Sequence, residues 1–172
     1  IQRFNSELKK LHAGRLKVSI SSSNNKGVVK HSLSLEGATS SVTPSSVLSE
    51  GECRIVSLAA FLADVTANDS ASPFIFDDPI CSLDQEFEEC VIDRLVELSK
   101  KRQVIVFTHR LSVLGMLNEK SDAIQIIGTR TEPWGAGEIG KTPLFAKKTA
   151  NALKALKVEY LSRAKKAYQD GY

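Results

Sequence analysis

The apolar residues in the first part of the chain change their spacing twice, and each spacing predicts a different element. Residues 1–11 carry apolar positions at helical spacing and predict a short helix. Residues 15–21 alternate apolar and polar side chains, which is typical of a strand. Asn-Asn-Lys-Gly at 24–27 predicts a hairpin turn, so residues 28–35 are expected to return as the paired strand. The polar residues 36–46 are expected to form a surface loop.

Beyond residue 50 the chain alternates between helical patterns and short apolar runs. This alternation predicts βαβ units with parallel strands. The run at 74–76 has no polar alternation, so we expect a central strand that is covered on both faces. The expected helices cover residues 51–67, 84–101 and 111–117, and the expected strands cover residues 74–76, 104–107 and 123–127.

The last part of the chain predicts a loop at 129–141 and then a long helix over 143–169. One face of this helix is apolar and includes Leu153, Leu156 and Tyr160, and we expect it to pack. The other face carries many lysines. Such a run is explained by a solvated surface, or by contact with a nucleic-acid backbone or an acidic partner domain.

Residues that suit a phosphate and a metal ion fall at the ends of these predicted elements. Ser49 and Gly51 stand where the second helix begins, and free N–H groups and the positive end of a helix dipole favour phosphate there. Glycine also lets the backbone approach a ligand closely. Asp77 and Asp78 end a strand at the sheet edge where ligands of open α/β sheets bind. One carboxylate can bind Mg²⁺, and the other can orient or deprotonate a water.

His109 ends the next strand and could reach the same edge to contact a γ-phosphate. Taken singly, these features are equally explained by a capped helix, an acidic turn and a lone histidine. Their fixed order within residues 47–109 favours one shared site over three coincidences.

Three sequences carry a resemblance to a known family: Leu-Ser-Glu-Gly-Glu at 48–52, Asp-Asp-Pro-Ile-Cys-Ser-Leu-Asp at 77–84, and Thr-His at 108–109. They resemble the signature loop, the Walker B motif with its D-loop, and the H-loop of ABC-type ATPase heads. The resemblance is to the SMC/RecF/RecN-like branch, and within it to the ATPase parts of RloC/PrrC-like proteins of anticodon nuclease and anti-phage defence systems.

This resemblance implies an α/β fold, the C-terminal lobe of a P-loop (ABC-type) ATPase head. We expect a mostly parallel sheet flanked by helices, an N-terminal β-hairpin and a long C-terminal helix. Residues 1–172 are expected to form a single domain. In it residues 1–13 end a possible coiled-coil stem, 14–128 form the lobe, and 143–169 form the long basic helix.

The resemblance also implies ATP hydrolysis with Mg²⁺ between two heads that dimerise around ATP. Aspartate stands at 78 where the family has a catalytic glutamate, and its shorter side chain predicts slow hydrolysis. The implied roles are nucleotide binding by Ser49, Gly51, Glu52 and Asp84, metal binding by Asp77, and catalysis by Asp78 and His109.

The implied partners are an N-terminal lobe that carries Walker A, a second head and nucleic acid, with no membrane. Residues 135–142 match the Walker A pattern, but no buried strand leads directly into them, so we expect a surface loop. The expected output is DNA repair, chromosome maintenance or anti-phage nucleic-acid cleavage. The alternative is a non-catalytic nucleic-acid or partner-binding module on an ABC-like fold, and a transporter nucleotide-binding domain is disfavoured.

Composition narrows the setting further. The chain has 172 residues, 42% of them hydrophobic, which is enough for a core, and its net charge of +3 says little about partners. No apolar run reaches the length of a membrane span. Three cysteines at no metal-like spacing predict a reducing, cytoplasmic setting with core or near-core thiols. The chain begins with Ile1 inside a predicted helix, so we expect it to be part of a longer protein.

Overall fold

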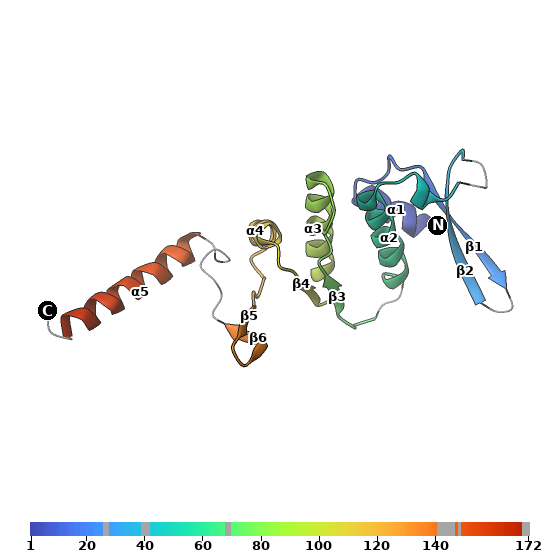
Figure 1. Ribbon diagram of the computed structural model, residues 1–172. Helices are drawn as coiled ribbons and strands as arrows, with labels where there is room; N and C mark the ends of the chain where they lie inside the picture. The colour runs from blue at the N-terminus through green and yellow to red at the C-terminus, as the bar shows by residue number, and fades with distance from the viewer. Residues whose placement is uncertain (26–27, 39–41, 68–69, 141–146, 148, 170–172) are drawn as a thin grey trace. The chain divides into compact units, whose positions relative to one another are not determined.

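The computed structural model describes residues 1–25, 28–38, 42–67, 70–140, 147 and 149–169, and it divides into two compact units (Figure 1). The first unit is Ile1–His109 and the second is Arg110–Tyr172. All the candidate site residues lie in the first unit. Its elements are α1 (Gln2–Lys10), β1 (Val18–Asn25), β2 (Val28–Leu35), the 3₁₀ turn η1 (Pro44–Ser46), α2 (Glu50–Val65), β3 (Phe74–Asp77), α3 (Gln85–Ser99) and β4 (Val104–Phe107).

The N-terminal hairpin is confirmed. β1 and β2 pair antiparallel with Val18 opposite Leu35, and hydroxyl groups meet across the pair, as between Ser19 and Ser34 at 2.9 Å. β1 begins and ends later than the predicted first strand at 15–21, and it includes positions 24–25 of the predicted turn. Positions 26–27 of that turn lie outside the described residues.

Helix α2 begins where the sequence places a helix start, because a reciprocal cap satisfies its first backbone donors. Ser49 is the N-cap, and Glu52 stands at the third helical position. The helix ends at Val65, and the Thr66 hydroxyl donates to the Leu62 carbonyl at the last turn. Its inward face is buried, as the apolar spacing predicts, and consists of Ile55, Val56, Ala59 and Leu62.

Strands β3 and β4 pair in parallel, as the alternation of strand and helix predicts, with Phe74 opposite Val104 and Asp77 opposite Phe107. The prediction that β3 is covered on both faces is wrong for this chain. Phe74 and Phe76 are buried, and Phe76 meets Phe61 of α2 edge to face with ring centroids 6.2 Å apart. Ile75, on the other face, is 61% exposed because no described element of this unit covers that side of the sheet.

The apolar face that helical spacing predicts for α3 is buried in the core of this unit. It consists of Phe87, Val91, Leu95 and Leu98. Helix α1, whose Phe4, Leu8 and Leu11 are also buried, packs beside α2 (Figure 1). Of the three cysteines, Cys90 of α3 is buried and Cys53 and Cys81 are half-buried, in agreement with core or near-core thiols.

A buried network of charges joins α1 to α3. The Arg94 guanidinium donates to both carboxylate oxygens of Glu7, from Nε at 2.8 Å and from Nη2 at 2.7 Å. Its Nη1 donates to Glu97 at 2.7 Å, and Lys10 donates to the other Glu97 oxygen at 2.7 Å. Arg94 and Glu7 are 8% and 7% exposed, so this bidentate pair is removed from water.

The second unit differs from the prediction. It comprises α4 (Leu111–Lys120), β5 (Gly128–Glu132), β6 (Gly135–Gly140) and α5 (Thr149–Gln169). The predicted third parallel strand at 123–127 is wrong, since no described strand pairs with that run. The predicted loop at 129–141 is wrong as well, because β5 and β6 form an antiparallel hairpin there.

This hairpin also contains most of the Walker A-like sequence. Residues 135–140 form strand β6, and the Trp134 indole donates to Glu138 across the turn at 3.1 Å. A phosphate loop needs free backbone N–H groups between a strand and a helix N-terminus, which a paired strand does not offer. Lys141 and Thr142 lie outside the described residues.

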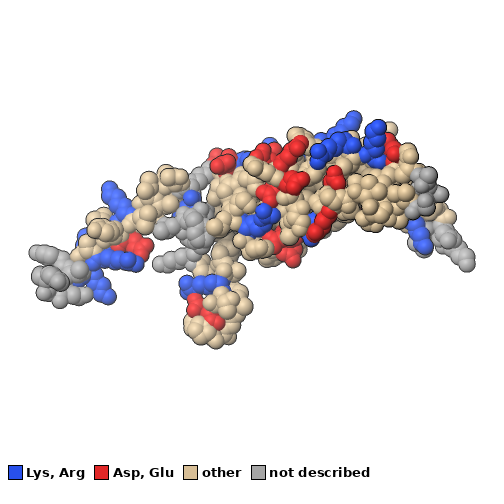
Figure 2. Space-filling model, turned by 45° about the horizontal axis from the view of Figure 1, so that its top comes forward, with Lys and Arg blue, Asp and Glu red and all other residues tan. Residues whose placement is uncertain are grey.

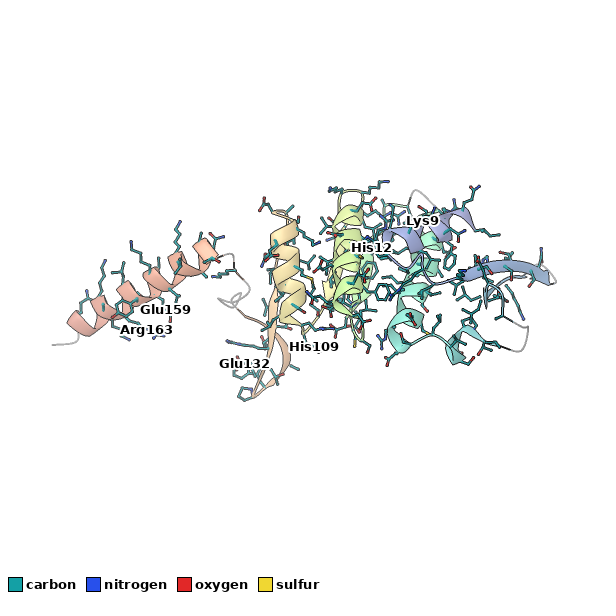
Figure 3. The ribbon with its side chains drawn as sticks, turned by 90° about the horizontal axis from the view of Figure 1, so that it is seen from above. Lys9, His12, His109, Glu132, Glu159 and Arg163 are labelled. Atoms are coloured by element: carbon teal, nitrogen blue, oxygen red, sulfur yellow. The ribbon has the colours of Figure 1, made fainter. Side chains whose placement is uncertain are left out.

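Helix α5 is a basic helix with an exposed apolar side. Leu153, Tyr160 and Leu161 are 62%, 77% and 50% exposed, so the packing that their spacing predicts is not seen. Its lysines and arginine are also exposed (Figure 2), and Arg163 pairs with Glu159 at 2.6 Å (Figure 3). The predicted start at 143 lies outside the described residues. Among the described helices, none combines the length and the apolar character that crossing a bilayer requires.

Candidate functional site

The carboxyl end of the parallel strands positions the two adjacent aspartates. Asp77 is the last residue of β3, and it is exposed on the open face of the sheet. Asp78 follows it with a φ of 42°, and its N–H donates to the Phe107 carbonyl at 2.9 Å. This left-handed backbone is uncommon for a non-glycine residue and turns the chain sharply at the sheet edge.

His109 reaches the same edge, as its place after β4 predicts. Its Nδ1 lies 2.7 Å from Oδ2 of Asp78. An ionised carboxylate can only accept a hydrogen bond, so Nδ1 carries the proton and donates it. The His109 side chain is 81% exposed, whereas that of Asp78 is 24% exposed. Nε2 of His109 is therefore the ring nitrogen left for a ligand.

The Asp78 carboxylate is held in its charged form. The Thr108 hydroxyl lowers the pKa of Asp78 most strongly, partial burial acts in the opposite direction, and the charge and N–H groups of His109 lower it further. Oδ1 of Asp78 is buried and has no hydrogen-bond partner among the described residues. An ionised oxygen without a donor is costly, so this atom marks a place where a donor from outside the chain fits.

The signature residues stand at the start of α2 and are bonded to one another. The Ser49 hydroxyl accepts from the Glu52 N–H at 3.2 Å, and the Glu52 carboxylate accepts from the Ser49 N–H at 2.9 Å. Ser49 is exposed, so its side chain is accessible to another molecule. The Glu52 carboxylate closes the helix cap, and this gives it a structural task beside the predicted nucleotide contact.

Gly51 lies against the turn at 78–84 of the same unit, the predicted D-loop. A β-carbon built on Gly51 would stand 2.7 Å from the Ser82 carbonyl oxygen. Asp84 follows two residues later as the N-cap of α3, exposed and without a side-chain hydrogen bond to that helix. Ser49 and Gly51 thus belong to a helix start that lies against the turn before Asp84.

Two residues at this site were missed by sequence reasoning. Thr108 is visible as the neighbour of His109, but nothing in the sequence indicates its effect on the pKa of Asp78. Ser82 has a φ of 59°, and serine gives no sign of that conformation, which glycine would have indicated.

The described residues do not form a complete metal site, since no three or more His, Cys, Asp or Glu side chains gather there. The exposed Asp77 carboxylate at the strand end nevertheless fits Mg²⁺, which is commonly held by one or two carboxylates together with phosphate oxygens and waters.

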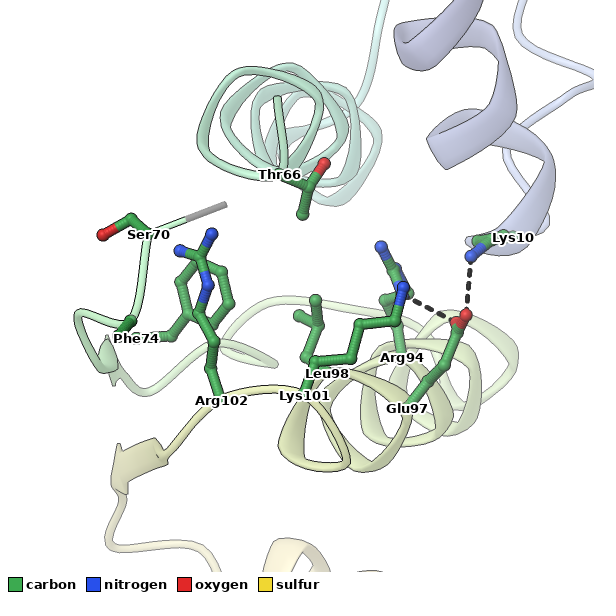
Figure 4. A pocket seen from close by; sticks show the side chains of 10 residues that line it. Lys10, Thr66, Ser70, Phe74, Arg94, Glu97, Leu98, Lys101 and Arg102 are labelled. Carbon is green, nitrogen blue, oxygen red and sulfur yellow. Dashed lines mark hydrogen bonds and ion pairs between the residues drawn. The ribbon is translucent and has the colours of Figure 1, made fainter. Parts of the chain in front are cut away.

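A cavity of about 360 Å³ lies at the other end of β3, where the strand begins at Phe74 (Figure 4). Helices α1, α2 and α3 all end beside it, and its lysine and arginine side chains offset the negative ends of their dipoles. The Arg102 guanidinium stands 4.7 Å from the centre of the Phe74 ring. This arrangement is explained by helix termination, and it is remote along the strand from Asp78. The basic residues at the cavity are Lys10, Arg94, Lys101 and Arg102.

Solved structures with a similar fold are SMC heads. One, described under ATP-driven dimerisation and DNA-stimulated activation of SMC ATPases, has 22% identity and a TM-score of 0.58, with 94% of this chain and 89% of that chain covered. An Smc head bound to the C-terminal winged-helix domain of ScpA has 23% identity and a TM-score of 0.58, with 79% of this chain and 40% of that chain covered.

A third is the Smc head with an extended coiled coil bound to the C-terminal domain of ScpA from Pyrococcus furiosus. It has 21% identity and a TM-score of 0.56, with 94% of this chain and 37% of that chain covered. The chain thus spans well under half the length of these two structures. No curated protein matches it.

The fold is therefore that of a lobe of an SMC-type ATPase head, and the domain is of the ATPase type. The family model AAA_13, described as an AAA domain, matches residues 1–169. The chain belongs to this family.

Proposed function

We propose that this chain is the C-terminal lobe of an SMC-like ABC ATPase head that binds and hydrolyses ATP between two heads. The observation that carries the proposal is the ion pair of Asp78 and His109, 2.7 Å apart, beside Asp77 at the carboxyl end of two parallel strands. This edge is where ligands of open α/β sheets bind.

In the proposed mechanism, Asp78 acts on the attacking water and His109 contacts the γ-phosphate. Because Nδ1–H of His109 is donated to Asp78, a hydrogen bond from this ring to phosphate must come from Nε2–H. That bond requires the doubly protonated ring. Asp78 in turn orients or deprotonates the water while it remains ionised. Its short side chain is consistent with slow turnover.

Asp77 would hold Mg²⁺, which neutralises developing charge on the phosphate oxygens when bound. ATP itself would be bound mainly by a second lobe that carries Walker A, because the described residues contain no phosphate loop. The open face of β3 and β4, with Ile75 61% and Phe107 58% exposed, gives such a lobe an apolar surface to cover.

The second head would supply Ser49, Gly51 and Asp84 to a nucleotide held by the first. Ser49 and Asp84 are exposed, as a contact across a dimer requires. A γ-phosphate bridging two heads is a contact that ADP lacks, so hydrolysis would favour separation of the heads. Dimerisation of the SMC ATPases in one of the similar structures is described as driven by ATP.

A shared site can be tested by mixing two variants of the complete head. We expect Asp78→Asn and Ser49→Arg to be inactive alone. In a mixed dimer, one of the two sites pairs an intact Asp78 with an intact Ser49 from the other head. Equal mixing should then restore about one quarter of the unmodified ATPase rate, since half the dimers are mixed and each has one good site. No recovery, with dimers still forming, would contradict a site made from two heads.

The chain by itself is expected to bind ATP poorly, because its described residues contain no main cradle for the β-phosphate. Isothermal titration of the isolated chain with Mg-ATP should give no saturable signal at micromolar concentrations. The matched control is the same titration with the Walker A lobe present. Micromolar binding by the chain alone would show that the phosphate site is here, and would point back to the sequence Gly135–Gly140 with its following lysine.

The wider role would be cytoplasmic and on nucleic acid, in DNA repair or chromosome maintenance, or in RloC/PrrC-like anti-phage cleavage. Within the single domain that we propose over residues 1–172, α1 would end a coiled-coil stem over 1–13, and residues 14–128 would form the lobe. Exposed lysines on α5 support contact of the basic helix over 143–169 with a phosphate backbone.

The second candidate function, a non-catalytic nucleic-acid or partner-binding module, is favoured by this same exposed helix. Dimerisation of the complete head separates the two candidates. An ATPase of this kind dimerises with ATP and not with ADP, whereas a binding module is indifferent to both.

A further inference from the structure

We propose that the signature turn and the D-loop form one preassembled surface, in which Ser82 is the positioning residue. Gly51 would lack a side chain because the Ser82 carbonyl occupies the space, rather than because a nucleotide must approach there. The inference rests on the proposed function and assigns that function a further residue.

The start of α2 lies against backbone atoms of the turn that contains Ser82. The β-carbon of any other residue at 51 would meet the Ser82 carbonyl oxygen at 2.7 Å and the Leu83 α-carbon at 3.8 Å. A separation of 2.7 Å is well inside van der Waals contact for carbon and oxygen. A carbonyl oxygen cannot swing aside as a flexible side chain can, so a methyl group at 51 must move either the start of α2 or the turn that contains Ser82.

The signature side of this contact is firmly held. The reciprocal cap between Ser49 and Glu52 fixes the first turn of α2, and the Cys53 N–H donates to the Ser49 carbonyl at 2.9 Å. The next turn carries Ile55, which is fully buried and anchors the helix in the core. The helix start is therefore the harder side to move.

The D-loop side is held by a short chain of backbone hydrogen bonds and a strained residue. The Cys81 N–H donates to the Asp78 carbonyl at 3.1 Å, and the Leu83 N–H donates to the Ile80 carbonyl at 3.4 Å. Ile80 is fully buried, but Ser82 is exposed with a φ of 59°. A serine keeps this strained backbone conformation only where neighbouring residues hold it in place, and Gly51 is one such neighbour.

This contact links both proposed halves of the chemistry. Asp78 stands four residues before Ser82 on the same loop, and Asp84 stands two residues after it. A shift of Ser82 would thus disturb a residue of the catalytic pair and a residue of the dimer surface together. Glycine at 51 keeps the loop where both can act.

The two explanations for Gly51 differ in the absence of ATP. If the glycine serves only the nucleotide, Gly51→Ala leaves the D-loop unchanged until ATP binds. If the glycine accommodates Ser82, the alanine displaces the D-loop at once. The half-buried thiol of Cys81, next to Ser82, reports on that loop directly.

The experiment measures the rate at which Cys81 reacts with a neutral thiol reagent in the complete head without ATP. A Cys53→Ser background removes the other half-buried thiol, and mass spectrometry assigns the modified residue. We expect Gly51→Ala to change the Cys81 rate by about threefold or more, since thiol reactivity follows exposure and local environment. The matched control is Gly115→Ala in α4, where a β-carbon would meet nothing within 4 Å, and no change is expected.

A second variant tests Ser82 itself. Glycine at 82 adopts a positive φ without strain and lets the loop move, so Ser82→Gly should restore most of the ATP-dependent dimerisation that Gly51→Ala loses. We expect about a tenfold loss of dimer affinity in Gly51→Ala and recovery to within about threefold in the double variant. Recovery of folding in the double variant counts equally if the single variant does not fold.

An unchanged Cys81 rate in Gly51→Ala would overturn the proposal, and so would a changed rate without rescue by Ser82→Gly. Failure of the proposed ATPase function is distinguishable, because it would appear as an absence of ATP-dependent dimerisation in the unmodified head. The thiol measurement needs no ATP and stands apart from that result.

Discussion

Asp78→Asn is expected to reduce ATP turnover by the complete head about 10²- to 10⁴-fold, the range that a positioned general base contributes. Asparagine keeps the size of the side chain and removes its charge and its ability to accept a proton. ATP binding and ATP-dependent dimerisation should persist, since the proposed phosphate and dimer contacts are made by other residues. Steady-state phosphate release gives the rate, and size-exclusion chromatography with light scattering gives the dimer.

The companion variants make this result specific. Asp77→Asn should instead weaken the binding of Mg²⁺, so that raised metal concentration recovers part of the activity. Asp78→Glu tests whether the short side chain limits the rate. If neither substitution at Asp78 alters turnover, the residue has no catalytic role.

Arg94→Leu is expected to destabilise the first unit by about 3–5 kcal/mol, because it leaves the buried Glu7 carboxylate without its bidentate partner. Urea unfolding followed by circular dichroism measures the loss. Adding Glu7→Leu should recover much of it, since two apolar residues of similar size replace a buried ion pair with little cost. The exposed pair of Arg163 and Glu159 supplies the control, and Arg163→Leu should change stability by less than about 0.5 kcal/mol.

Acid should weaken the same network. The Lys10 hydrogen bond and the Arg94 charge lower the pKa of Glu97 against a smaller opposing effect of burial. Its contribution is therefore complete above the ordinary carboxylate range and is lost as the pH falls through the lowered pKa. In Arg94→Leu this acid dependence should shrink. An Arg94→Leu protein as stable as the unmodified one would mean that the network stabilises nothing.

The order of the motifs allowed much of the first unit to be predicted. The helix start near Ser49 and Gly51 is where the sequence predicts it, the face of α3 follows helical spacing, and parallel pairing follows from the strand–helix alternation. His109 meets Asp78 because adjacent parallel strands end at one edge.

The features that the sequence did not predict depend on contacts between residues far apart in the chain. Residues 123–127 have a strand-like composition, but a strand also needs a neighbour, and none of the described residues supplies one. Ile75 was expected to be covered because it belongs to an unbroken apolar run. Such a run does not show which face of the strand lacks a covering element. The left-handed backbone of Ser82 follows from loop closure and leaves no mark on residue type.

The exposed side of β3 and β4 is expected to lower the solubility of the isolated chain. Both strands have an outer edge unpaired within the described residues, and Ile75 and Phe107 project from the bare face. Unpaired edges next to apolar side chains recruit other strands indiscriminately. Overproduced alone, the chain should therefore precipitate or form oligomers, and co-expression with the lobe that carries Walker A should raise its soluble yield.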